Sequence, residues 1–274
     1  MGAAYRALAA LPAFRHHVAA EAHDDPLFFL GNRHYLARGL SPPARMDAAL
    51  THYNAEERRR GTAYFEAVYR QGGLVLWDHA AGDHRYNITL CPGSDVAYEG
   101  GLSLVLHVDG GRVCVLSFSV VPSTIVLPGH KIPALHETIL FITRKQLAQD
   151  RTYQTAFNKA FHRCTPAHMV LGALAGFAAV QGQGHALGIA AERHPSCTPE
   201  AEPRFQRAYN DFWLSVSGQR LSPLGYLIDL PPRLSPIEGM DAAHRRRAFA
   251  RRKHIDEVQH ITTQRLAASL APPA

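Results

Sequence analysis

The sequence predicts an α+β protein with a mixed, largely antiparallel sheet and flanking helices. Three observations indicate this class. Helical periodicity fills most of residues 1–70, a run of short β-branched segments follows, and helices then alternate with single strands. A meander of strands followed by crossover connections is typical of α+β folds.

The size and composition of the chain indicate one domain. It has 274 residues, of which 46% are apolar and 19% are charged, as in ordinary globular proteins. We expect three parts within that domain: an N-terminal helical segment at 1–70, an α/β core at 71–236, and a basic C-terminal helix at 237–274 that packs on the core.

The first half of the chain contains the predicted meander. Helices are predicted at Pro43–Tyr53 and Glu56–Tyr69, where apolar residues recur at helical spacing. Asp109-Gly110-Gly111 predicts a hairpin turn, because Gly tolerates positive φ and Asp can bond its own backbone. The predicted strands are short and rich in β-branched residues: Leu74–Trp77, Tyr86–Leu90, Leu102–Val108, Val113–Val121 and Thr138–Ile142.

The second half alternates helices and strands. Thr165-Pro166 is typical of a helix start, and Gly182 or Gly184 would end that helix. The other predicted elements are helices at 153–161 and Glu202–Ser215 and strands at Ala186–Ala191 and Tyr226–Leu230. This order resembles an N-acetyltransferase-like fold, in which two central strands splay apart and a helix N-terminus receives a pyrophosphate. The core is therefore expected to be acyltransferase-like.

Location and metal binding are constrained by what the sequence lacks. The sequence contains no run of about 18 apolar residues, so no membrane-spanning helix is predicted. Leu8–Phe14 is too short and too polar for a signal peptide. The default expectation is the cytoplasm. The four cysteines form no CxxC pair, and the 17 histidines show no zinc-motif spacing, so we expect reduced thiols and no metal.

Positive charge gathers near the C-terminus, within a formal net charge of +6. Such a run can hold phosphate, a nucleic acid backbone or acidic lipid. The alternative is a solvated face of a helix docked by an apolar stripe. This apolar stripe would comprise Phe249, Ile255, Val258, Ile261 and Leu266. The positively charged residues of the run are Arg245, Arg246, Arg247, Arg251, Arg252 and Lys253.

Several phrases in order resemble the VirK/YbjX family of bacterial proteins. They are Ala49-Leu50-Thr51-His52-Tyr53, the segment from Gly101 through Ser119, Tyr209-Asn210-Asp211-Phe212-Trp213, and Glu238 followed by Arg245–Arg247 and Arg251-Arg252. The resemblance spans about residues 34–266. It implies association with the cell envelope, virulence and tolerance of antimicrobial peptides, without a defined biochemical activity.

The chain departs from that family's pattern at three places, which identifies it as a divergent member. Residues 143–147 stand where the family has a glycine-rich turn, and residues 162–166 stand where it has His-Gly-Leu-Arg-Pro. Residues 239–241 replace its closing Ile-Pro-Ser. A glycine-rich turn lets the backbone approach a phosphate. In its place, Arg144 and Lys145 are expected to hold a phosphate by charge.

General acid–base transfer is the enzyme chemistry that the residues favour. The sequence has no G-x-S-x-G, P-loop or G-x-G-x-x-G motif. Tyr209 lies where an acetyltransferase-like fold places a tyrosine that protonates the leaving thiolate, although its spacing also fits a core residue. His194, just past a strand, and Glu137 and Asp211 are the other catalytic candidates. Further candidate bases on or beside the central strands are Glu99, His107 and His136.

We therefore predict transfer of an acyl or aminoacyl group to an amine of a small molecule, peptide or lipid precursor. Donors would be an acyl-CoA, an acyl carrier or an aminoacyl-tRNA, with no tightly bound cofactor. Contacts with tRNA and a membrane surface are both compatible with the basic tail. The alternative is a non-catalytic envelope-associated factor binding acidic lipid or peptide. The predicted donor-binding residues are Arg144, Lys145, Arg163, Arg246, Arg251 and Arg252.

Overall fold

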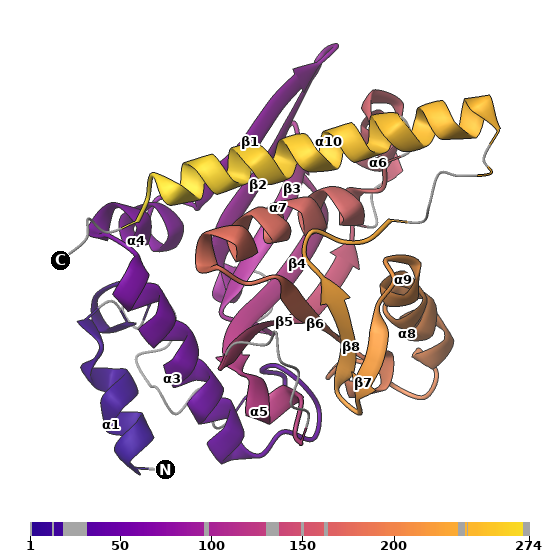
Figure 1. The fold of residues 1–274 in the computed structure, drawn as a ribbon. Helices are drawn as coiled ribbons and strands as arrows, with labels where there is room; N and C mark the ends of the chain where they lie inside the picture. The colour runs from indigo at the N-terminus through magenta and orange to yellow at the C-terminus, as the bar shows by residue number, and fades with distance from the viewer. Residues whose placement is uncertain are drawn as a thin grey trace.

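In the computed structural model the chain forms one eight-stranded sheet with helices around it (Figure 1). The structure describes residues 2–12, 14–18, 32–95, 99–129, 137–148, 151–161, 164–234, 239 and 241–270. The strands are β1 (Leu74–Ala81), β2 (His84–Pro92), β3 (Leu102–Val108), β4 (Gly111–Pro122), β5 (Thr138–Leu147), β6 (His185–Ile189), β7 (Gln219–Ser222) and β8 (Gly225–Asp229).

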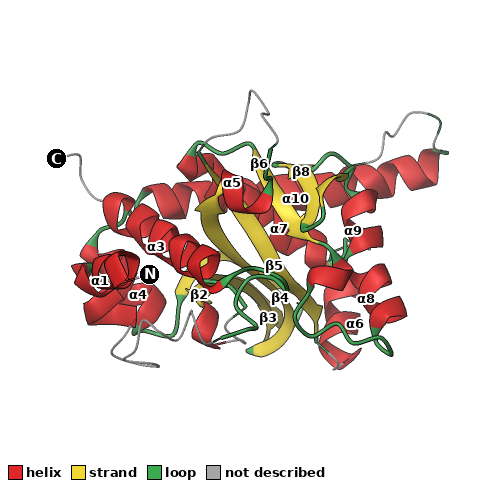
Figure 2. Cartoon of the chain, turned by 90° about the horizontal axis from the view of Figure 1, so that it is seen from below, coloured by secondary structure: helices red, strands yellow, loops and turns green. Residues whose placement is uncertain are grey.

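Helices lie on both sides of the sheet. Figure 2 shows α1, α3 and α4 gathered at one side of the molecule and α6, α8 and α9 at the other. Their bounds are α1 (Gly2–Ala10), α3 (Pro42–Arg59), α4 (Thr62–Tyr69), α5 (Ser123–Val126), α6 (Arg151–Ala160), α7 (Pro166–Gln181), α8 (Glu202–Ala208), α9 (Asn210–Ser215) and α10 (Ala242–Ala267), with short helical turns at Phe14–Val18, Gly93–Asp95 and Ala191–Arg193.

The strand order is β1-β2-β3-β4-β5-β6-β8-β7, and every neighbouring pair is antiparallel except β5 and β6. The predicted mixed, largely antiparallel α+β architecture is therefore confirmed. The parallel pair needs a crossover, which α6 and α7 provide. The candidate site lies at the end of this single parallel pair, in the middle of an otherwise antiparallel sheet.

Two of the tight hairpins follow from local sequence. Asp109 and Gly110, with φ of 50° and 79°, form the predicted turn between β3 and β4. The turn between β1 and β2 contains Gly82, with φ of 60°. His79 and His84 belong to the paired ends of β1 and β2, because Gly82-Asp83 alone is enough to reverse the chain.

The long helices α7 and α10 pack together over the sheet (Figure 1). Thr165 caps α7 as predicted, its side chain accepting the His168 N–H, and Gly182 ends α7 in the left-handed conformation. A Cβ at Gly176 would lie 2.6 Å from the Gln259 carbonyl oxygen, so glycine is what permits this close approach. Phe249, expected in the docked stripe of α10, is instead 55% exposed, because the face that packs on α7 is formed by residues from Ala248 and Ile255 onward.

Two other elements differ from expectation. The predicted helix at Glu202–Ser215 is divided at Tyr209 into α8 and α9, and β7 was not predicted. Strand β5 is longer than predicted and includes 143–147, which was interpreted as a turn. Among the described residues, none of the helices combines the length and the apolar character that crossing a bilayer requires.

Candidate functional site

A cavity of about 630 Å³ opens where β5 and β6 diverge. Their pairing ends at Ile142↔Gly188, yet β5 continues to Leu147. Thr143 is an extra residue in β5, because Ile142 lies opposite Phe118 and Arg144 opposite Ser117. Such a bulge bends a strand and redirects its side chains, and bulges recur beside active sites. The cavity is lined by Arg144, Lys145, Gln146, Leu147, His194, Ser196, Arg204, Phe205, Arg207, Ala208 and Tyr209.

Tyr209 lies at the break between α8 and α9 and is 4% exposed. Its hydroxyl oxygen accepts the backbone N–H of Lys145 at 3.2 Å, so its own hydrogen is left for another acceptor. Its ring stacks on Phe205, with centroids 5.6 Å apart and an interplanar angle of 5°. Burial raises the pKa of Tyr209, which keeps the hydroxyl protonated at neutral pH.

Hydrogen bonds join helix α9, which follows Tyr209, to the end of β6 and the residues just after it. The Trp213 indole N–H donates to the Ile189 carbonyl at 2.8 Å, and the Asn210 side-chain oxygen accepts the Ala191 N–H at 2.9 Å. A Cβ at Gly188 would lie 2.4 Å from the Trp213 ring, so the strand makes room for the indole. These contacts hold the Tyr209 hydroxyl at the point where the two strands separate.

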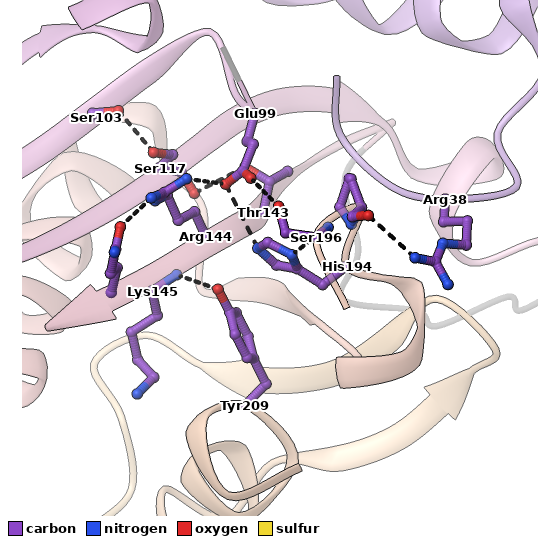
Figure 3. Close-up of polar contacts among 12 residues, drawn as sticks. Arg38, Glu99, Ser103, Ser117, Thr143, Arg144, Lys145, His194, Ser196 and Tyr209 are labelled. Atoms are coloured by element: carbon purple, nitrogen blue, oxygen red, sulfur yellow. Dashed lines mark hydrogen bonds and ion pairs between the residues drawn. The ribbon is translucent and has the colours of Figure 1, made fainter. Parts of the chain in front are cut away.

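One wall of the cavity is a group of interacting side chains, here named the closed cluster: the buried Glu99 and His194, the half-buried Arg144 and the exposed Ser196 (Figure 3). An Arg144 guanidinium nitrogen lies 2.8 Å from Glu99 Oε2, and His194 Nε2 lies 3.6 Å from the same oxygen. The Ser196 hydroxyl donates to Glu99 Oε1 at 3.4 Å. The Arg144 guanidinium is therefore paired with a carboxylate of the protein itself.

The closed cluster determines the charge state of Glu99 and the tautomer of His194. Burial alone would raise the pKa of Glu99, but His194 and Arg144 outweigh it and hold that pKa below its ordinary value. The Ser196 N–H donates to His194 Nδ1 at 3.1 Å. The hydrogen of the neutral imidazole is therefore assigned to Nε2, which faces Glu99.

The opposite wall carries cations without such partners, here named the open cations: Lys145, Arg204 and Arg207. Figure 3 shows the Lys145 side chain leaving β5 on the side opposite to Arg144. Its ammonium lies 4.3 Å from the centroid of the Phe212 ring, and burial lowers its pKa. In the part of the chain that the structure describes, no carboxylate forms an ion pair with any of the three. The cavity thus favours an anion on this side.

A segment before α3 braces the closed cluster from outside. The Leu36 N–H donates to the Glu99 carbonyl at 3.0 Å, and the Arg38 N–H donates to the Arg193 carbonyl at 2.7 Å. The Arg38 guanidinium also donates to the carbonyls of Pro195 and Cys197, at 3.1 and 2.5 Å. Sequence reasoning missed Arg38, because nothing local in the sequence places it beside a loop that follows it by more than 150 residues.

Four predicted site residues meet at the cavity: Arg144, Lys145, His194 and Tyr209. Glu99, a candidate base, joins them through Arg144 and His194. The structure does not bring the other predicted residues to the lining. Glu137 is exposed at the opposite end of β5, Asp211 is exposed on α9, Arg246 is exposed on α10, and Arg251 and Arg252 are partly buried on α10. Arg163 and His136 lie outside the described residues, and His107 bonds Asn87 on β2.

Glu137 and Asp211 are excluded from the site for identifiable geometric reasons. Glu137 precedes β5, whereas the cavity lies beyond the end of the β5–β6 pairing, so the length of the paired strands separates them. Asp211 follows Tyr209 by two residues in α9, and side chains at that spacing do not share a helix face. We therefore remove both from the catalytic group.

Comparison with known proteins gives a family but no activity. A search of curated proteins finds no match. A family model described as "Protein of unknown function (DUF535)" matches residues 19–262, which is most of the chain and includes every residue of the closed cluster and every open cation. This is the family to which the VirK/YbjX resemblance pointed. The chain therefore belongs to the DUF535 family.

Proposed function

We propose that the chain transfers an acyl or aminoacyl group from a phosphate-bearing donor to an amine of a small molecule, peptide or lipid precursor. The observation that carries this proposal is the protonated Tyr209 hydroxyl in a cavity that opens between two diverging strands. On this proposal the chain is a divergent family member with an N-acetyltransferase-like core, and it acts in the cytoplasm.

The sheet supports this assignment. Strands β1 to β5 form an antiparallel meander, β5 and β6 are parallel, and β8 lies between β6 and β7. That arrangement resembles the acetyltransferase-like order expected from the sequence. Ligands of open sheets with parallel strands commonly bind beyond the carboxyl ends of those strands, where the connections leave a crevice. The cavity lies at that end of the β5–β6 pair.

The charges support a donor that carries phosphate. Because Glu99 already engages Arg144, the open cations are better suited than Arg144 to bind a phosphate from outside. This changes the predicted role of Arg144, which we assign to positioning. Acyl-CoA, an acyl carrier and aminoacyl-tRNA all present phosphate beside the reacting ester or thioester. No tightly bound cofactor is required for the transfer.

The chemical step needs one acid and an unprotonated amine. The amine nitrogen attacks the donor carbonyl, a C–N bond forms, and the C–S bond of a thioester or the C–O bond of an ester breaks. The Tyr209 hydroxyl donates its proton to the leaving sulfur or oxygen. The amine loses a proton to solvent, from which Tyr209 is reprotonated. His194 Nδ1 already accepts the Ser196 N–H and Nε2 is turned toward Glu99, so we propose that His194 positions the wall rather than accepting this proton.

Substitution of Tyr209 by Phe tests the proposal. The purified full chain would be incubated with acetyl-CoA or with a mixture of charged tRNAs, together with a panel of amines, and products measured by mass spectrometry. Transfer should fall about 10²–10⁴-fold with the thermal midpoint nearly unchanged, since only a hydroxyl is removed. The matched control is Tyr226→Phe, another buried tyrosine, whose hydroxyl meets Arg220 outside the cavity.

Two results would count against the proposal. Full activity of Tyr209→Phe would make Tyr209 a core residue, as its spacing also allows. If that variant unfolds, Lys145→Met provides the second test, because it should weaken donor binding about 10- to 100-fold in a folded protein. An acyltransfer role would also be rejected if the wild type transferred no group from acetyl-CoA and none from charged tRNA.

A further inference from the structure

The N-terminal half of α10 presents a basic surface that the proposed chemistry does not use. We name it the α10 basic face: Arg245, Arg246, Phe249, Arg252 and Lys253. Figure 1 shows this end of α10 extending past α6 and α9. The apolar residues of the helix face α7 instead, and they are buried from Ile255 to Leu266. Residues 245–253 contain no acidic residue.

The N-terminal half of α10 approaches the cavity at His168, at the start of α7. The His168 ring lies 5.5 Å from the Phe212 ring, over which the Lys145 ammonium also sits. Burial, together with the positive charges of Arg251 and Lys145, lowers the pKa of His168 to about 4. Arg251 of α10, which is not part of the α10 basic face, and Lys145 of the cavity therefore act on the same side chain, so this turn of α10 adjoins the cavity.

The chemistry of the surface favours phosphate as its partner. Arginine outnumbers lysine on it, and a guanidinium matches phosphate geometry with paired donors. A single small donor would be held by the open cations alone. The additional cations on α10 extend over about 10 Å from Arg246 to Lys253, at about 1.5 Å per residue of helix, which suits a polyanion.

The same surface fits an RNA better than a membrane or an acidic protein. Both of the latter need an apolar contact: an interfacial helix buries a broad apolar face, and a protein interface has an apolar centre. On this face Phe249 is the one apolar anchor, because the others pack on α7. RNA binding requires no such patch, since its affinity comes mainly from phosphate contacts, and an exposed aromatic ring can stack on a base.

We infer that the α10 basic face binds the phosphate backbone of an RNA that delivers its 3′ end to the cavity. The inference rests on the proposed function, and it selects the aminoacyl-tRNA class among the donors. The acyl C–O bond of the 3′ ester would break, the ribose oxygen would take the Tyr209 proton, and the acceptor amine would form the C–N bond while releasing a proton to solvent.

Fluorescence anisotropy with the full chain tests the inference. The probe is a labelled RNA hairpin with a short single-stranded 3′ tail and no acyl group, titrated at several salt concentrations. The double variant Arg246→Glu/Lys253→Glu should bind about tenfold more weakly and lower the salt slope by about 1.5, because each lost phosphate contact removes about 0.7–0.9. The control Arg58→Glu/Arg85→Glu makes the same charge change at exposed residues of α3 and β2.

Equal weakening by the two double variants would overturn the inference, since binding would then depend on net charge alone. So would failure of the wild type to bind the RNA. A third arm uses vesicles containing phosphatidylglycerol. If the α10 variant loses vesicle binding while RNA binding is unchanged, the surface serves acidic lipid instead. The probe carries no acyl group, and Tyr209→Phe should bind it normally, so failure of the transfer chemistry is distinguished from failure of this surface.

Discussion

The two walls of the cavity use charge in opposite ways. In the closed cluster, Glu99 forms ion pairs with Arg144 and His194, and hydrogen bonds from Arg38 hold the loop behind them. On the other wall, Lys145 is nine-tenths buried, yet its ammonium meets only an aromatic ring among the contacts described. Arg144 and Lys145 are adjacent in the sequence, so this difference comes entirely from the side of β5 on which each side chain lies.

The contrast indicates which wall is structural and which is available to a ligand. A buried charge is costly unless it is paired, and a fully paired cluster has little left to offer a ligand. An unpaired buried ammonium is a cost that folding alone does not explain. Bound phosphate would remove that cost. We therefore expect changes to the closed cluster to affect stability and changes to Lys145 to affect binding.

The largest expected effect on stability is that of Glu99→Gln. It leaves Arg144 and His194 without their carboxylate, and breaking one partner of a buried pair costs about 3–5 kcal/mol. The free energy of unfolding, measured with urea, checks this. The matched control is Glu137→Gln at the exposed end of β5, which should stay within about 0.5 kcal/mol of wild type. A Glu99→Gln variant as stable as that control would contradict the closed cluster.

Lys145→Met should have the reverse profile. We expect stability equal to or above that of the wild type, because an unpaired buried charge is removed. Donor binding, measured by calorimetry with uncharged tRNA and with coenzyme A, should weaken about 10- to 100-fold for whichever of the two binds, which corresponds to a lost charged hydrogen bond of about 1.5–3 kcal/mol. Lys159→Met, at an exposed lysine of α6, is the control. If Lys145→Met destabilises the fold while binding is retained, the distinction between the walls fails.

Arg38→Met should have a smaller effect, concentrated on the loop that follows β6. Its side chain is exposed, so losing its bonds to the Pro195 and Cys197 carbonyls should cost about 1 kcal/mol. The specific readout is the NMR signal of the His194 ring, which should broaden or shift. Arg33→Met, an exposed arginine nearby in the sequence, should leave that signal unchanged.

The smallest effect concerns pH. The pKa of Glu99 is depressed in the folded state, so the unfolded chain binds more protons in the window below about pH 4.5. Stability from this group is complete above that pH and is lost as pH falls through the folded pKa. The difference in unfolding free energy between wild type and Glu99→Gln should therefore shrink on acidification. A difference that stays constant or grows toward low pH would mean that Glu99 is not held as a carboxylate.

Much of the fold could be predicted from local sequence. The turn at Asp109-Gly110, the cap at Thr165 and the stop at Gly182 each depend on the conformation of a few adjacent residues. Predictions failed where tertiary contacts override local preference. The helix containing Tyr209 is interrupted because Asn210 and Trp213 are bonded to the end of β6, and β5 extends past Ile142 because β4 continues to pair with it.

The candidate site was only partly predictable. Tyr209 was predicted from its place in an acetyltransferase-like fold, His194 from its position just past a predicted strand, and Arg144 and Lys145 from their charge. The sequence offered no means of separating the roles of these two cations, because their difference depends on a bulge at Thr143 and on a carboxylate 45 residues earlier. Glu137 and Asp211 were equally plausible by residue type.

The sequence by itself determined most of the elements, their order and the types of residue available for chemistry, because periodicity, caps and turns are set by backbone geometry over a few residues. Only the tertiary structure decided which charges meet. The parallel crossover from β5 to β6 brings Glu99, Arg144, His194 and Tyr209 together from four distant segments. Charge interactions depend on distance and burial, and neither is defined until the sheet has assembled.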